Sequence, residues 1–276
     1  MTTELTIAGL AAGPIEPTPD QSWHGHSTAA AVKLSNVSKV FGRGAEAVPV
    51  LDRVSLTIGA GEFVCLVGAS GCGKSTLLSL LAGLDAPTQG RILVEGEGSP
   101  ALMFQEPALF PWLSVAGNVG LPLALRGLSR KDRRERVAEL LHLVHLEEFG
   151  KRQPHELSGG MRQRVALART LGLDAPVLLM DEPFGALDAM TRDVLHDELE
   201  RIWTERRLTV IFVTHNVREA ARLGDRIVLM SSRPGRVAWE RPVDIPRPRR
   251  IDSPEVAAIA ADVTNRLRSE VRRHGH

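Results

Sequence analysis

The chain has 276 residues, and its 34 Lys and Arg residues against 33 Asp and Glu residues give a formal net charge of +1. This balance excludes a polybasic nucleic-acid-binding arm or a strongly acidic tail as the organising feature of the protein. Hydrophobic residues make up 43% of the chain, which is enough for a substantial core, but seven Phe, four Trp and no Tyr offer few rings on which bases could stack.

The ends and the cysteines of the chain narrow the class of protein further. Residues 1–31 are rich in Pro, Gly, Thr and Ala without periodicity, which predicts a disordered extension and not a secretory signal. No run is long and apolar enough to predict a membrane-spanning helix. Cys65 and Cys72 have the spacing of neither a metal site nor a disulfide framework, which is typical of a reducing compartment.

From about residue 32 onward, strand patterns alternate with helical ones. Alternating apolar positions predict strands at residues 31–34 and 54–58. The continuous apolar run from Phe63 to Val67 predicts a strand buried on both faces of a parallel sheet. This alternation of strands and helices indicates an α/β fold with a mostly parallel sheet. Three later runs share the buried-strand pattern: residues 177–180, 210–213 and 227–230.

Two further helical regions are expected. Between residues 111 and 173 no buried-strand run occurs, and amphipathic periodicity, including Lys131 to His145, predicts a helical insert. The prolines from Pro242 onward predict a loop. After it, Ser253 as N-cap and Pro254 in the first helical position predict a C-terminal helix that runs to about Arg273.

One stretch matches the phosphate-binding pattern G-x-x-x-x-G-K-[ST], directly after a predicted strand and before an apolar helix: Gly68-Ala69-Ser70-Gly71-Cys72-Gly73-Lys74-Ser75-Thr76. The glycines let consecutive backbone N–H groups point into one concavity, and the helix N-terminus adds partial positive charge. Lys74 would neutralise the β- and γ-phosphates of a nucleotide, and the Ser75 hydroxyl would bind Mg²⁺. The alternative is a glycine-rich turn with a chance lysine, but strand, loop and helix stand in the required order.

A carboxylate pair follows the predicted strand at residues 177–180. Asp181 at the strand end is expected to hold Mg²⁺, directly or through water, as in a Walker B motif. Glu182 then projects to the other side and can orient and deprotonate an attacking water. A polar strand terminus without function is the alternative for an isolated pair.

Cys72 lies inside the predicted cradle and carries two open interpretations. A helix N-terminus favours the thiolate, which predicts that alkylation inactivates the protein and that nucleotide protects it. The alternative is a buried, inert thiol.

A second glycine-rich stretch forms another candidate anion cradle before a helix: Leu157-Ser158-Gly159-Gly160-Met161. A chain with two such cradles suggests a nucleotide that is shared between two chains. The stretch resembles the LSGGQ signature of the ATP-binding-cassette (ABC) family, with Met161 in place of the usual glutamine. The replacement leaves the cradle of Ser158, Gly159 and Gly160 intact.

The remaining motifs of that family occur in the expected order. By this resemblance, Gln105 senses Mg²⁺, Phe41 stacks on adenine, and Ala186-Leu187-Asp188 forms a loop that reaches across a dimer interface. His215 resembles the histidine that contacts the γ-phosphate, and a neutral imidazole can hydrogen-bond charge that develops in the transition state. As isolated residues, Phe41 would more often belong to a core and His215 to a structural contact.

The resemblance covers about residues 32–250. It implies a P-loop NTPase (RecA-like) core with a mostly parallel sheet, an antiparallel part near the N-terminus and a helical subdomain inserted at about residues 111–173. Residues 251–276 would be a C-terminal helical tail. The resemblance also implies a homodimer that binds two ATP molecules with Mg²⁺, each held by the P-loop of one copy and by residues 158–160 of the other.

Within the family, four segments are similar to ATPase subunits of the nitrate/sulfonate/taurine importer group: residues 110–115, 184–192, 230–237 and 245–249. Membership of this group implies a membrane permease as partner, a periplasmic or extracellular substrate-binding protein as an indirect partner, and no nucleic acid. It places the chain peripherally on the cytoplasmic face of a bacterial inner membrane. Residues 105–119, with Phe110, Trp112 and Leu113, would receive the permease.

Two other function classes stay open at this point. A cassette ATPase that works on DNA or ribosomes without a permease tends to carry tandem cassettes or coiled-coil insertions, and this chain has one cassette and a near-zero net charge. A regulatory protein that binds ATP without hydrolysing it would not need Glu182 and His215. The sequence therefore predicts an importer ATPase ahead of both.

Overall fold

The computed structural model describes residues 30–96, 98–185 and 187–274. Residues 1–29 of the predicted extension lie outside the described residues. The first strand begins at Ala30, before the boundary that we predicted at residue 32. No helix within the described ranges is long and apolar enough to cross a membrane.

A three-stranded antiparallel sheet forms the N-terminal layer. Its central strand is β1 (Ala30–Phe41), flanked by β2 (Val48–Gly59) and β4 (Gln89–Val94) in the order β2-β1-β4. The single-turn helix η1 (Gly44–Glu46) joins β1 to β2. Alternate residues of β2, including Val54 and Ile58, are fully buried, as period-two patterning predicts. The antiparallel part of the predicted fold is confirmed.

A six-stranded sheet forms the centre of the molecule, in the order β5-β6-β7-β3-β8-β9. Neighbouring strands are parallel throughout except that β9 is antiparallel to β8. Its strands are β3 (Phe63–Gly68), β5 (Ala101–Met103), β6 (Val177–Asp181), β7 (Thr209–Val213), β8 (Arg226–Met230) and β9 (Val237–Pro242). The mostly parallel sheet is therefore confirmed, although β4, β5 and β9 were not predicted.

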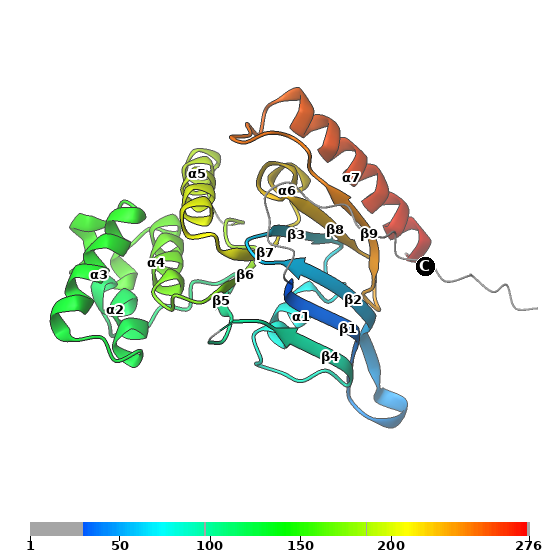
Figure 1. The fold of residues 1–276 in the computed structure, drawn as a ribbon, viewed down its shortest axis with the longest axis horizontal. Helices are drawn as coiled ribbons and strands as arrows, with labels where there is room; N and C mark the ends of the chain where they lie inside the picture. Colours follow the sequence, from blue (N-terminus) through cyan, green and yellow to red (C-terminus); the bar gives the residue numbers. More distant parts are fainter. Residues whose placement is uncertain (1–29, 97, 186, 275–276) are drawn as a thin grey trace, which may run out of the picture.

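The helices lie on both faces of this sheet (Figure 1). Helix α1 lies between the two sheets, α5, α6 and α7 cover the opposite face, and α2, α3 and α4 gather at one end of the molecule, between β5 and β6 in the chain. Their bounds are α1 (Lys74–Leu81), α2 (Val115–Leu125), α3 (Arg130–Leu143), α4 (Gly159–Leu171), α5 (Ala189–Arg206), α6 (Val217–Leu223) and α7 (Pro254–His274), with single turns η2 (Glu147–Phe149) and η3 (Pro154–Glu156).

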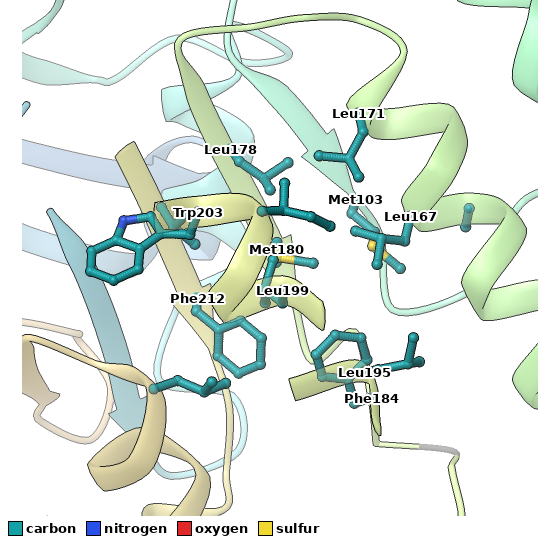
Figure 2. Packing of buried hydrophobic residues seen from close by; sticks show 14 of the residues in the cluster. Met103, Leu167, Leu171, Leu178, Met180, Phe184, Leu195, Leu199, Trp203 and Phe212 are labelled. Carbon is teal, nitrogen blue, oxygen red and sulfur yellow. The ribbon is translucent and has the colours of Figure 1, made fainter. Parts of the chain in front are cut away.

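The central strand β3 divides the core into two apolar clusters. Phe63, Cys65 and Val67 point to the face covered by α5, whereas Val64 and Leu66 point toward α1 and the antiparallel sheet. Because both faces are covered, every residue of β3 is buried. Figure 2 shows the first cluster, where Phe184, Leu195 and Phe212 pack beside Met180.

The C-terminal helix belongs to the same core. Helix α7 packs on α6, and Val256, Ile259 and Val263 are buried in the first cluster. Ser253 caps the helix, since its Oγ accepts a hydrogen bond from Val256 N at 3.3 Å. The helix and its cap agree with the sequence-based expectation.

Candidate functional site

The predicted phosphate cradle joins the end of β3 to the start of α1. Gly71 and Gly73 have φ values of +75° and +101°, a region that favours glycine because a Cβ would clash with the backbone. A Cβ on Gly73 would also lie 2.7 Å from Leu51 Cδ2. The glycines therefore allow both the loop conformation and its close packing on β2.

Lys74 lies at the inner face of this loop. Its side chain is buried, and Nζ donates hydrogen bonds to Gly68 O and Ala69 O, each at 2.9 Å. Ser75 and Thr76 follow in the first turn of α1, while Ser70 and Gly71 at the tip are exposed. Because the first N–H groups of a helix lack intrahelical acceptors, this end of α1 attracts anions. The structure thus brings a cation and free backbone donors together.

Cys72 is buried behind the cradle, with 1% of its surface exposed. Burial raises the pKa of its thiol above the ordinary value, although the nearby Lys74 ammonium acts in the opposite direction. The helix N-terminus does not outweigh this desolvation. The structure favours the buried, inert thiol over the reactive thiolate.

Asp181 ends β6 beside the start of α1. Burial is the main reason that the pKa of Asp181 is raised; the Ser75 hydroxyl beside the carboxylate acts in the opposite direction, and the Glu182 charge adds to the increase. A hydroxyl next to a partly desolvated carboxylate is an oxygen donor set that suits Mg²⁺, which typically takes one or two protein ligands and completes its shell with phosphates and water. No group of three or more His, Cys, Asp or Glu side chains within the described residues could hold a metal alone.

Glu182 and His215 form a pair at the same edge of the sheet. Glu182 Oε2 lies 3.0 Å from His215 Nδ1, and the imidazole is largely exposed. Glu182 has a φ of +43°, unusual for a residue with a side chain, and its N–H donates to Val213 O at 3.0 Å. Such backbone strain recurs at functional sites, where the surrounding structure holds it in place.

The second candidate cradle is the N-terminus of α4. Ser158 is the N-cap, and its Oγ accepts a hydrogen bond from Met161 N at 3.2 Å. Gly159 and Gly160 form the first helical turn, so they lie within the helix and not before it as we predicted. Ser158 and Gly159 are exposed, whereas Met161 packs against the core.

Asp188 caps α5. Its carboxylate accepts hydrogen bonds from Thr191 N at 2.9 Å and Thr191 Oγ1 at 2.7 Å, which lower its pKa. Arg192 supports the preceding loop by donating to Leu187 O at 2.7 Å. Of the predicted interface loop, Ala186 lies outside the described residues.

Gln105 and Phe41 are both exposed on the surface. The hydrogen bond at Gln105 is made by its backbone carbonyl, which accepts from Gln163 Nε2 at 3.4 Å. Phe41 ends β1 with 45% of its surface exposed, and Lys39 Nζ lies 4.9 Å from its ring centroid. Neither side chain contacts Asp181 in the described structure, so both roles stay predictions.

Two residues that sequence reasoning missed hold the loop after Gln105. Asn118 in α2 is fully buried and donates to the carbonyls of Phe110 and Leu113, each at 3.1 Å. Arg169 in α4 donates to Ala108 O at 2.7 Å. Trp112 projects from this fixed loop with 72% of its surface exposed. A polar residue within an apolar helix was the one signal for Asn118, and Arg169 gave none.

This chain is similar to known proteins along most of its length. A sequence model of the family described as "ABC transporter" matches residues 51–185. The taurine import ATP-binding protein of Sinorhizobium fredii is 48% identical over 73% of this chain and 78% of its own length. An aliphatic sulfonates import ATP-binding protein of Bacillus cereus is 45% identical over 79% of this chain and 88% of its own length. The nitrate import ATP-binding protein of Synechocystis sp. is 43% identical over 78% of this chain and 83% of its own length.

A solved structure is similar along most of this chain. It is a dimeric, post-hydrolysis state of an ATP-binding cassette bound to ADP and Pi, with 36% identity and a TM-score of 0.71, and the match covers 78% of this chain and 99% of that one.

Proposed function

Because this chain belongs to the ABC transporter family, we propose that its ATPase activity powers import of a small anion through a separate membrane permease. Relatives at 43% to 48% identity are named as import ATP-binding proteins for taurine, aliphatic sulfonates and nitrate. The observation that carries the proposal is the arrangement of Lys74, Asp181 and the Glu182–His215 pair at one edge of the sheet.

Each residue of this edge has a proposed part in hydrolysis. The cradle of residues 68–76 binds the phosphates of ATP, and Lys74 neutralises their charge. Ser75 and Asp181 would hold Mg²⁺, with Gln105 as a further contact, and the bound ion would stabilise charge on the phosphates. Glu182 orients a water and accepts its proton as the water oxygen bonds to the γ-phosphorus. The bond between that phosphorus and the β–γ bridging oxygen breaks, which releases ADP and phosphate. His215 donates a hydrogen bond to the γ-phosphate oxygens.

Two copies of the chain would complete each site. The exposed N-terminus of α4, with Ser158, Gly159 and Gly160, offers a second set of helix N–H groups to an anion. We propose that it faces the nucleotide of a second copy, with Phe41 stacked on adenine and Asp188 at the interface. The dimeric state of the similar cassette supports this arrangement.

The permease would bind the loop at residues 105–119. Asn118 and Arg169 fix this loop from two helices, and Trp112 is exposed on it, which is what an aromatic anchor for a partner requires. We therefore propose that the chain lies peripherally on the cytoplasmic face of the membrane. A substrate-binding protein outside the membrane would deliver the anion to the permease.

Hydrolysis by the purified chain, alone and with its permease, tests the proposal. We expect the chain to hydrolyse MgATP. A co-purified permease with its binding protein should stimulate this hydrolysis when a sulfonate or nitrate is supplied. Trp112→Ala should lower the stimulation without lowering the basal rate. Stimulation by DNA or ribosomes in place of the permease would favour the alternative class of cassette ATPase. Absence of hydrolysis under both conditions would contradict the proposal.

A further inference from the structure

A buried polar network lies directly behind the Glu182–His215 pair. His196, in the middle of α5, has no exposed surface, and its Nε2 lies 2.6 Å from Glu219 Oε1 in α6. The other carboxylate oxygen of Glu219 accepts a hydrogen bond from Thr214 Oγ1. Thr214 immediately precedes His215, so the network joins α5 to the segment that carries the exposed imidazole.

The network fixes the chain on both sides of His215. Thr214 Oγ1 accepts from Asn216 N at 3.0 Å, which leaves its proton for Glu219. Asn216 Oδ1 in turn caps α6 by accepting from Arg218 N at 3.1 Å. The backbone of Thr214 is anchored to β3 through its N–H, which donates to Leu66 O at 3.2 Å.

The imidazole of His196 also contacts the segment after Glu182. The rings of Phe184 and His196 are 5.4 Å apart in an edge-on arrangement, and Phe184 is buried (Figure 2 shows its place in the core). Glu182, His215, Thr214 and Glu219 line one small cavity of about 30 Å³, the space of roughly one water molecule. A shift of His196 would therefore reach both members of the reacting pair.

Packing alone does not explain these residue types. A buried carboxylate costs free energy unless it is paired and hydrogen-bonded, and an apolar pair of similar volume often joins two helices at least as well. What a hydrogen-bonded pair adds is a fixed direction and distance between α5 and α6. Helix α5 is also the helix that Asp188 caps at its N-terminus.

We propose that His196 and Glu219 are positioning residues that hold His215 and Glu182 in the geometry for hydrolysis and tie them to the helix that begins at Asp188. The proposal rests on the function proposed above for Glu182 and His215. In this proposal the two residues act through Thr214 and Phe184 and not by contact with the nucleotide.

The test compares His196→Leu, which removes the hydrogen bond, with His196→Gln, whose amide N–H can replace Nε2. We expect His196→Leu to lower kcat for MgATP about tenfold or more, with KM within about twofold, because small displacements of reacting groups are costly and the phosphate cradle is untouched. His196→Gln should restore most of kcat. Glu219→Leu combined with His196→Leu should be no worse than the poorer single variant, since the two residues act as a unit.

A matched control lies at the opposite edge of the sheet. Glu62 is also buried and hydrogen-bonded to a basic partner, Arg226 Nε, at 2.7 Å. Glu62→Gln should lower thermal stability and leave kcat unchanged. Wild-type kcat in folded His196→Leu, or a loss that His196→Gln does not rescue, would overturn the proposal.

A second readout needs no hydrolysis and separates this proposal from the proposed function. The imidazole NMR signals of His215 in the nucleotide-free protein, assigned with His215→Ala, should move in His196→Leu and return in His196→Gln. Unchanged signals would overturn the positioning role whether or not the wild type hydrolyses ATP. Conversely, an inactive wild type in which these signals respond as expected would contradict only the proposed function.

Discussion

Both edges of the six-stranded sheet at which its parallel strands begin and end carry charged side chains, but the two edges use them differently. At the edge where β3, β6 and β7 begin, the charges pair with one another: Arg226 Nε lies 2.7 Å from Glu62 Oε1, and Arg247 lies 2.9 Å from Asp225. Arg249 goes further and donates to backbone carbonyls, including Val243 O at 2.9 Å and Gly224 O at 2.5 Å. Each of these groups is satisfied within the chain.

At the edge where the same strands end, the groups are held but less fully satisfied. Burial raises the pKa of Asp181, Glu182 sits at a positive φ, and His215 is largely exposed. The first edge therefore contributes stability, while the second stores strain and desolvation that a charged ligand can relieve. Substitutions at the two edges should separate activity from stability.

The largest expected effect is on turnover. Glu182→Gln removes the proposed base and should lower the rate of ATP hydrolysis by about 10²- to 10⁴-fold, with ATP binding retained. Steady-state hydrolysis and a fluorescent-nucleotide titration measure the two quantities. Glu240→Gln is the matched control, because Glu240 pairs with Arg226 at the other edge. Wild-type hydrolysis by Glu182→Gln would contradict the proposed role.

The next effect is on stability and concerns Arg249. Arg249→Ala leaves carbonyls at the end of α6 without donors and should lower the free energy of unfolding by about 3 kcal/mol in urea titrations. Hydrolysis per folded molecule should not change. The neighbouring Arg250 is exposed and pairs with Asp252, so Arg250→Ala should stay within about 0.5 kcal/mol of wild type. Equal effects of the two variants would argue against the clamp at Arg249.

Asp181→Asn should change how the stability of the folded protein depends on pH. Because burial raises the pKa of Asp181 in the folded protein, wild-type stability falls as pH rises from the unfolded value of about 3.9 through the raised folded value. The variant escapes this loss, so without nucleotide it should have the higher Tm at pH 7 and no advantage near about pH 3. Thermal unfolding at both pH values checks this, and a lower Tm at pH 7 would contradict the cause we assign. Mg²⁺-dependent hydrolysis should be lost.

The last prediction concerns the reactivity of the Cys72 thiol. Since the thiol is buried and its pKa is raised, iodoacetamide should react with it far more slowly in the native protein than in urea. Peptide mapping by mass spectrometry follows the modification. Alkylation at the rate of a free thiol, with protection by MgATP, would restore the alternative of a reactive thiolate in the cradle.

The sequence predicted what depends on local patterns and missed what depends on distant partners. The strand, loop and helix of the cradle at residues 68–76 follow one another in a single segment, so the motif predicts all three. The buried strands are recognisable as continuous apolar runs. Strand β5 has three residues and β9 carries polar side chains, so neither shows a period. The contact of His196 with Glu219 joins residues from two helices, and no spacing in the chain encodes it.

In the proposed function, ATP joins two copies of this chain, and each copy supplies part of the site. The most direct measurement is the mass in solution of Glu182→Gln with saturating MgATP, compared with the same protein without nucleotide, by light scattering after size exclusion. ATP should shift the mass from monomer to dimer, and Lys74→Ala in the same background should abolish this shift. A variant that binds ATP and still has the monomer mass would contradict it.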